Sequence, residues 1–393
     1  MVNKVSDAIR YIGVDDLELD LFESQYIVPE GMAYNSYLIL DEKTAVMDTV
    51  DSHKTEEFLN NLKEELNGRS LDYIVVQHLE PDHSGSLAAT VKAYPDAKIV
   101  SNAKTFAMIP QFMDIDLPEE KTVVVKEGDT LSLGSHTLQF ILTPMIHWPE
   151  VMMTYESSEK VFFSADAFGK FGAICKEDEN EEGWACEARR YYFGIVGKYG
   201  MPVQNLLKKA ASLDIEKICP LHGPVLDSDL EYYINTYNTW SSYQPEDKGV
   251  FIAYASIHGN TAVAAKRLAE ILTAMGEKVA ISDLCREDMA ECVEDAFRYD
   301  RMVLCASSYD GGVFLPMHDF LTHLSYKTYQ NRAVAFVENG SWGPTAARTM
   351  KSLVEPMKNI TIIDPVVTIK SSMKEADVSK LEELAMAVVA AAR

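Results

Sequence analysis

The sequence has no long apolar run and comparatively few basic side chains. No hydrophobic stretch approaches the about 18 residues that a membrane-spanning helix requires. The 393 residues include 36 Lys and Arg against 60 Asp and Glu, which gives a formal net charge of −24. Since nucleic acids and anionic membranes attract clustered basic side chains, we expect neither as a partner.

Closely spaced cysteine pairs are also absent. None of the six cysteines forms a C-x-x-C pair, and rubredoxin-type and zinc-ribbon sites both need close thiolate pairs. The sequence therefore excludes such a site within these residues. Thiols outside a disulfide framework are typical of intracellular proteins, and the first residues lack the apolar core of a signal peptide. We expect a cytoplasmic protein.

The two halves of the chain have different patterns, as expected for a length that suits two or three domains. In the first half, short strands alternate with helices up to about residue 125, strands follow one another over 121–163, and helical patterns return, the first of them over 187–199. This predicts an α/β sandwich of two sheets covered by helices. A polar segment with Pro and Gly at 243–249 predicts a linker, so the predicted domains are 1–246 and 247–393.

The second half repeats one unit. Five strand-like runs at 250–256, 278–284, 301–308, 332–339 and 361–369 alternate with amphipathic helices. Strict alternation of this kind predicts a doubly wound parallel sheet.

Histidine and carboxylate side chains gather at the predicted strand ends. Four fall within six residues directly after the strand 72–77, and three follow later strands. The rim of a rigid scaffold is where such ligands are presented. Imidazole and carboxylates without thiolate favour iron or manganese, and zinc stays possible. Seven ligands suffice for two metals, with Asp166 as the natural bridge. The predicted metal ligands and catalytic residues are His78, Glu80, Asp82, His83, His147, Asp166 and His222.

The string H-x-E-x-D-H, followed by His, Asp and His at strand ends, resembles the flavodiiron proteins of the metallo-β-lactamase superfamily. The hydrolases of that superfamily typically carry His where this chain has Glu80, and the carboxylate marks the iron-binding branch. The resemblance implies a metallo-β-lactamase-like αββα sandwich. It also implies one iron held by His78, Glu80 and His147, a second held by Asp82, His83 and His222, and Asp166 as the bridge.

Three loops after strands of the second half form a second constellation. The loop 256–261 opens a helix with hydroxyls, a glycine and no Lys or Arg, which fits a phosphate cradle made of neutral dipoles. Two further loops end at the same edge of the predicted sheet, where ligands bind. This half resembles flavodoxin, which implies FMN. The expected contacts are Ser256, Ile257, His258, Gly259, Asn260, Thr261, Ser307, Ser308, Tyr309, Asp310, Gly311, Gly312, Asn339, Gly340, Ser341, Trp342 and Gly343.

Together the resemblances imply an oxidoreductase that reduces O₂ to water, NO to N₂O, or both, with electrons passed through FMN to a non-haem di-iron centre. They also imply rubredoxin or a similar small electron donor, and a head-to-tail homodimer or dimer of dimers. Rubredoxins are usually acidic, as this chain is, so docking requires a local basic surface. In such a dimer Trp148 would lie near the partner's flavin, and Tyr191 or Tyr192 could reach the metal pocket.

Two alternatives stay open at this point. One is a zinc-dependent hydrolase of the metallo-β-lactamase type fused to a flavodoxin module, against which Glu80 argues. The other is an electron carrier with a vestigial first domain, against which the complete ligand set argues.

Overall fold

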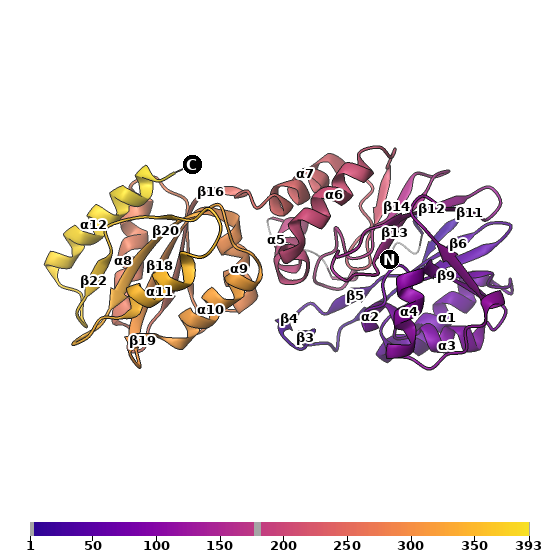
Figure 1. Ribbon diagram of the computed structural model, residues 1–393, viewed down its shortest axis with the longest axis horizontal. Coiled ribbons are helices and arrows are strands. Elements are labelled where there is room, and N and C mark those ends of the chain that lie inside the picture. The colour runs from indigo at the N-terminus through magenta and orange to yellow at the C-terminus, as the bar shows by residue number, and fades with distance from the viewer. Residues whose placement is uncertain (1–3, 177–181, 393) are drawn as a thin grey trace. The chain divides into compact units, whose positions relative to one another are not determined.

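The computed structural model describes residues 4–176 and 182–392, which form two compact units (Figure 1). The first consists of Met1–Tyr192 and Met201–Tyr237, and the second of Phe193–Gly200 and Asn238–Arg393. The domain boundary at residue 246 stays a prediction. Within the described residues, no helix combines the length and the apolar character that crossing a bilayer requires.

Two sheets form the centre of the first unit. One sheet has the order β1 (Ile9–Tyr11), β6 (Tyr37–Leu40), β7 (Thr44–Met47), β8 (Tyr73–Val75), β9 (Lys98–Asn102) and β10 (Thr122–Val125). The other has the order β11 (Thr130–Ser132), β12 (Thr137–Leu142), β13 (Met152–Glu156), β14 (Val161–Phe163) and β15 (Lys217–Cys219). Buried side chains of both sheets, among them Tyr37, Met47, Phe140 and Phe163, share one core.

Helices cover this pair of sheets on both sides. Figure 1 shows α1 (Thr55–Leu66), α3 (Leu87–Ala93) and α4 (Ala103–Phe112) on one side, and α6 (Gly200–Ala210) and α7 (Leu230–Ser241) on the other. The predicted αββα sandwich is therefore confirmed. The helix expected over 187–199 is not continuous, because α5 (Trp184–Tyr191) passes into a π turn at Tyr192–Val196 and a 3₁₀ turn at Gly197–Tyr199.

The second unit is a doubly wound parallel sheet, as predicted. Its strands have the order β17 (Val279–Asp283), β16 (Asp247–Ala255), β18 (Tyr299–Tyr309) and β20 (Ala333–Asn339), all parallel. The single strand expected over 361–369 was wrong, because β20 pairs instead with two short strands, β21 (Thr361–Ile362) and β22 (Val367–Ile369). Pro365 lies between them and has no N–H to donate to a continuous ladder.

Helices cover both faces of this sheet. On one face, α8 (Asn260–Ala274) and α12 (Glu375–Ala390) contribute Leu268 and Leu384 to a core that also contains Ile252 of β16. The neighbouring Phe251 points to the opposite face, where its ring centroid lies 6.3 Å from that of Phe320 in α10 (Leu315–Tyr326). The remaining helices are α9 (Met289–Arg298) and α11 (Ala346–Val354). This arrangement leaves the loops at the carboxyl ends of the strands free to bind a ligand.

Candidate metal centre and flavin pocket

The loop after β8 is held in place before any ligand is considered. The buried carboxylate of Asp48 accepts hydrogen bonds from the backbone N–H of Gln77 at 2.7 Å and of His78 at 3.3 Å. Glu80 then caps a short helix, α2 (Pro81–Ser84), with Pro81 in its first turn. The turn directs the side chains that follow β8 toward the interior of the unit.

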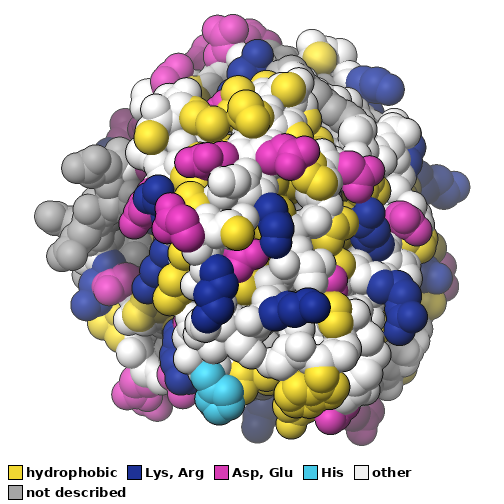
Figure 2. Space-filling view, turned by 90° about the vertical axis from the view of Figure 1, so that its left-hand side faces the viewer, with side chains coloured by type: hydrophobic (Ala, Val, Ile, Leu, Met, Phe, Trp, Pro, Cys, Tyr) yellow, Lys and Arg dark blue, Asp and Glu magenta, His cyan; other side chains and the backbone are white. Residues whose placement is uncertain are grey.

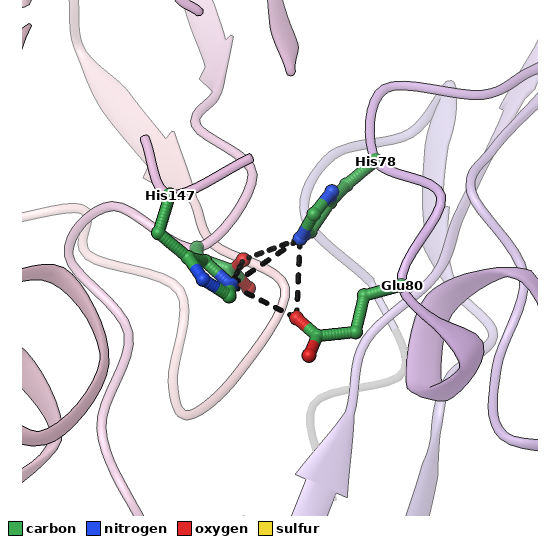
Figure 3. Close-up of side chains that lie close together, drawn as sticks. His78, Glu80 and His147 are labelled. Carbon is green, nitrogen blue, oxygen red and sulfur yellow. Dashed lines mark hydrogen bonds and ion pairs between the residues drawn. The ribbon is translucent and has the colours of Figure 1, made fainter. Parts of the chain in front are cut away.

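His78, Glu80 and His147 come together although His147 lies far along the chain (Figure 3). The Oε2 atom of Glu80 lies 2.8 Å from Nε2 of His147 and 3.2 Å from Nε2 of His78. The two Nε2 atoms lie 3.4 Å apart. The three side chains thus turn one ligand atom each toward a common point.

Asp82, His83 and His222 form a second group. The Oδ2 atom of Asp82 lies 3.2 Å from Nε2 of His83 and 3.2 Å from Nε2 of His222. All three residues are buried. This group has the same composition as the first, with two imidazoles and one carboxylate.

Asp166, which follows β14, lies between the two groups. Its Oδ2 atom lies 3.1 Å from Nε2 of His78 and 3.4 Å from Nε2 of His147. Its Oδ1 atom lies 3.1 Å from Nε2 of His83 and 3.6 Å from Nε2 of His222. One carboxylate oxygen therefore faces each group, which is the arrangement of a bridging ligand.

The electrostatics of this cluster favour a bound cation. Burial and the neighbouring carboxylates raise the pKa of Asp82 to about 7, even though His83 lowers it. Both carboxylate oxygens of Asp82 and Nε2 of His222 are buried and have no hydrogen bond of acceptable geometry within residues 4–176 and 182–392. Unsatisfied buried polar atoms destabilise a fold by about 1–3 kcal/mol each. Metal ions at the two groups would satisfy these atoms, so the seven residues fit a pair of metals.

Two contacts behind the ligands were missed by sequence reasoning. The Oε1 atom of Glu150 lies 2.8 Å from Nδ1 of His78, and the carbonyl oxygen of Ala33 lies 2.7 Å from Nδ1 of His222. Neither residue belongs to a ligand-like spacing, and Ala33 acts through its backbone. Only the fold brings them behind the imidazole rings.

Aromatic side chains surround the same cluster. The ring centroid of Trp148 lies 5.4 Å from that of His78 and 6.2 Å from that of His147. Tyr191 lies 5.4 Å from the ring of His222, whereas Tyr192 packs on Tyr237 at 5.1 Å. Of the two tyrosines, Tyr191 is thus the one whose ring contacts a predicted ligand.

The second unit carries a pocket of about 530 Å³ at the carboxyl ends of its strands, a volume typical of a cofactor site. Among the described residues, no Lys or Arg lines it. The lining consists mainly of hydroxyls, amides and backbone groups, with His258 and Asp310 beside them. The predicted residues that line it are Ser256, Ile257, His258, Asn260, Thr261, Ser307, Ser308, Tyr309, Asp310, Gly311, Asn339, Gly340, Ser341, Trp342 and Gly343. Gly259 and Gly312 do not line it, and their role in binding stays a prediction.

Two further residues line this pocket that the sequence reasoning missed. The Thr345 backbone N–H donates to Oγ of Ser308 at 2.8 Å, and the Ser371 backbone N–H donates to Oδ1 of Asn339 at 2.9 Å. Ser371 follows β22, so the rule that ligand-binding residues follow strands could have found it. Trp342 is 97% exposed at the pocket, which leaves its ring available to a flat ligand.

The chain resembles known proteins in sequence and in fold. Residues 32–223 match the protein family described as ODP family beta lactamase. An anaerobic nitric oxide reductase flavorubredoxin of Vibrio vulnificus is 32% identical over 358 residues, which cover 87% of this chain and 70% of that protein.

Solved structures extend the likeness over the whole chain. The rubredoxin oxygen:oxidoreductase of Desulfovibrio gigas is 26% identical, with a TM-score of 0.91 over 99% of this chain and 98% of that chain. A flavodiiron protein of Giardia intestinalis has the same fold, with a TM-score of 0.90 at 21% identity over 99% of this chain and 97% of that chain. The chain therefore belongs to the flavodiiron protein family of oxidoreductases.

Proposed function

We propose that this protein reduces O₂ to water, NO to N₂O, or both, with electrons that FMN passes to a non-haem di-iron centre. The observation that carries the proposal is the position of Asp166, whose two oxygens face two separate groups of imidazole and carboxylate ligands. When bound, FMN and the iron pair would supply the electrons, four for each O₂ or two for each pair of NO molecules.

The residues of the first unit would each have a distinct role in that reaction. His78, Glu80 and His147 would hold one metal, Asp82, His83 and His222 the other, and Asp166 both. Burial raises the pKa of the Tyr191 hydroxyl well above its usual value, and the charge of Asp166 raises it further. Tyr191 therefore stays protonated beside His222 and can donate a hydrogen bond to a bound substrate.

The residues of the second unit would bind FMN without a countercharge. The start of α8 at Asn260 and Thr261 offers backbone N–H groups and a hydroxyl to a phosphate. Tyr309 and Trp342, at the pocket rim, present aromatic rings to an isoalloxazine.

A small acidic electron carrier such as rubredoxin would dock on the second unit. Residues 247–393 carry 16 basic and 19 acidic side chains, whereas residues 1–246 carry 20 and 41. Figure 2 shows Lys and Arg side chains spread among acidic ones on one face of this unit. The nearly neutral unit is therefore the one an acidic partner would approach with less repulsion.

We further propose that electrons pass between chains in a head-to-tail homodimer or dimer of dimers, with Trp148 near the partner's flavin. The support is that Trp148 contacts both His78 and His147 and also packs on Phe112, which is 40% exposed. Flavin-to-iron electron transfer that is as fast in Trp148→Ala as in the wild type would contradict this role.

Metal analysis and anaerobic turnover test the proposed function. Protein loaded with FMN and iron should consume O₂ or NO when reduced rubredoxin is supplied, and the two gases are tested separately. About two irons per chain are expected. Zinc in place of iron, with hydrolytic activity, would overturn the redox assignment. If the flavin is reduced but neither gas is consumed, the protein would be an electron carrier and not a gas reductase.

A further inference from the structure

Three of the four predicted histidine ligands differ in the group that faces Nδ1, namely His78, His83 and His222. Each turns Nε2 toward the cluster, so Nδ1 is the atom that the protein can use to adjust the ring. Nδ1 of His78 faces the carboxylate of Glu150 at 2.8 Å, and Nδ1 of His222 faces the neutral backbone carbonyl of Ala33 at 2.7 Å. Nδ1 of His83 is buried without a hydrogen-bond partner in the described part of the chain.

Glu150 is fixed in this position from several directions. Its side chain has no exposed surface, and Oε1 also accepts the backbone N–H of Leu79 at 3.0 Å. The backbone carbonyl oxygen of Glu150 accepts a hydrogen bond from Nδ2 of Asn102 at 2.6 Å. Asn102 is itself held, because its Oδ1 caps α4 by accepting the N–H groups of Lys104 and Thr105. The carboxylate therefore cannot turn away from His78 without losing the N–H of Leu79, and Asn102 holds the backbone that carries it.

A carboxylate behind a ligating imidazole has a known physical effect. It fixes the tautomer with the proton on Nδ1, so that Nε2 is free to bind metal, and it makes that nitrogen more electron-rich. A carbonyl has a weaker effect because it carries no net charge. An imidazole without a partner gains neither.

We propose that Glu150 makes the two metal positions unequal, so that the iron at His78, Glu80 and His147 is held more tightly and is harder to reduce than the iron at Asp82, His83 and His222. This inference rests on the proposed di-iron centre and adds a positioning residue to it. The weaker position would lose its iron first to a chelator and would accept the first electron.

The variant Glu150→Gln tests this directly, since it keeps the size of the side chain and an oxygen for the N–H of Leu79. In the iron-loaded wild type, a chelator should release iron in two phases of equal size. In Glu150→Gln the slow phase should become about 10–100-fold faster, and the fast phase should not change. The reduction potentials of the two irons should also become more alike. The mixed-valence centre should therefore give an EPR signal over a narrower range of applied potential.

Glu156→Gln is the matched control. Glu156 is equally buried, but its carboxylate accepts the backbone N–H groups of Ser158 at 2.8 Å and Glu159 at 2.7 Å, and it does not belong to the metal cluster. It should leave both phases of iron release unchanged. Equal acceleration in both variants would show an effect of charge alone and would overturn the role of the hydrogen bond.

Asn102→Ser gives a second variant in case Glu150→Gln folds poorly. Serine still caps α4, but its short side chain lacks the reach of the amide Nδ2 that donates to the carbonyl of Glu150, so it should shift the slow phase in the same direction. A wild type that binds no iron would refute the proposed function. A wild type that binds two irons and releases them in one phase would refute only the inequality.

Discussion

The Oε2 atom of Glu80 lies nearer to Nε2 of His147, at 2.8 Å, than to Nε2 of His78, at 3.2 Å. Hydrogen bonds to these imidazoles hold the pKa of Glu80 well below its usual value despite burial. The carboxylate is thus ionised and ready to bind a cation.

Replacing Glu80 with Gln should remove one metal and leave the other. The amide cannot supply the charged oxygen that the first group presents, whereas Asp82, His83 and His222 are untouched. We expect Glu80→Gln to lose roughly half of the bound iron, because a metal site depends on its deprotonated ligands. Elemental analysis of purified protein measures this.

Glu159→Gln is the control for that experiment. Glu159 also pairs with a histidine, since its Oε1 lies 3.2 Å from Nε2 of His136, but neither residue belongs to the metal cluster. Its iron content should equal that of the wild type. Full iron occupancy in Glu80→Gln would show that Glu80 is not a ligand.

The metal residues could be predicted because each follows an apolar strand or lies in one compact string. Asp166 follows β14 and His222 follows β15, which are neighbouring parallel strands whose ends lie together. His78 follows β8 of the other sheet, which shares one core with theirs. Their division into two groups came only from the resemblance, since no spacing in the sequence says which imidazole faces which carboxylate.

Residues outside such positions could not be predicted in the same way. Glu150 lies in the connection between β12 and β13, where no periodic pattern fixes the path of the chain. The break between β21 and β22 was missed because apolar residues on both sides of Pro365 read as one strand. The π turn after Tyr191 was missed because its residues suit an α-helix equally well.

Asn260 offers a test of the flavin pocket. It is the first residue of α8 and lines the pocket. Asn260→Asp would place a negative charge beside a bound phosphate, and we expect the dissociation constant for FMN to rise at least about tenfold, or about 1.4 kcal/mol. Quenching of FMN fluorescence during titration of the apoprotein measures this.

Asn260→Asp should not destabilise the fold, so a loss of FMN affinity can be distinguished from misfolding. An acidic residue at a helix N-terminus interacts favourably with the helix dipole, so the melting temperature of the apoprotein should not fall. Asn67→Asp, at an exposed position of the first unit, should bind FMN as the wild type does. Unchanged FMN affinity in Asn260→Asp would place the phosphate elsewhere.

Arg332 allows a test of what stabilises the second unit. Its guanidinium is fully buried and donates to the backbone carbonyls of Tyr299 at 2.8 Å, Tyr243 at 2.7 Å and Gln330 at 3.0 Å, and also to that of Phe297. Arg332→Met would remove all of these hydrogen bonds from a buried position. We expect the free energy of unfolding of the second unit to fall by about 3 kcal/mol or more.

Denaturant unfolding followed by flavin release measures that loss. Arg348→Met is the control, because Arg348 is exposed on α11 and its removal should change the free energy by less than about 0.5 kcal/mol. Equal stability of the two variants would mean that other groups replace the contacts of Arg332.

His136 connects the two sheets of the first unit through a pair of carboxylates. Nδ1 lies 2.8 Å from Oδ2 of Asp41, in the turn between β6 and β7. Nε2 lies 3.2 Å from Oε1 of Glu159, in the turn between β13 and β14. Burial alone would lower the pKa of His136, but these hydrogen bonds and the nearby charge of Glu156 outweigh burial and raise it above its ordinary value of 6.5.

This raised pKa fixes the direction of a pH effect on stability. A protonated His136 contributes its full stabilisation below the pKa of histidine in the unfolded chain, near 6.5, and the contribution disappears as pH rises through the higher pKa of the folded state. Wild type and His136→Gln should therefore differ most in free energy of unfolding near pH 5, and the difference should shrink toward about pH 9. Urea unfolding of both proteins across that range measures it. A difference that grows with pH would mean that His136 acts as a neutral hydrogen-bonding group, and its two carboxylate contacts would then not be ion pairs.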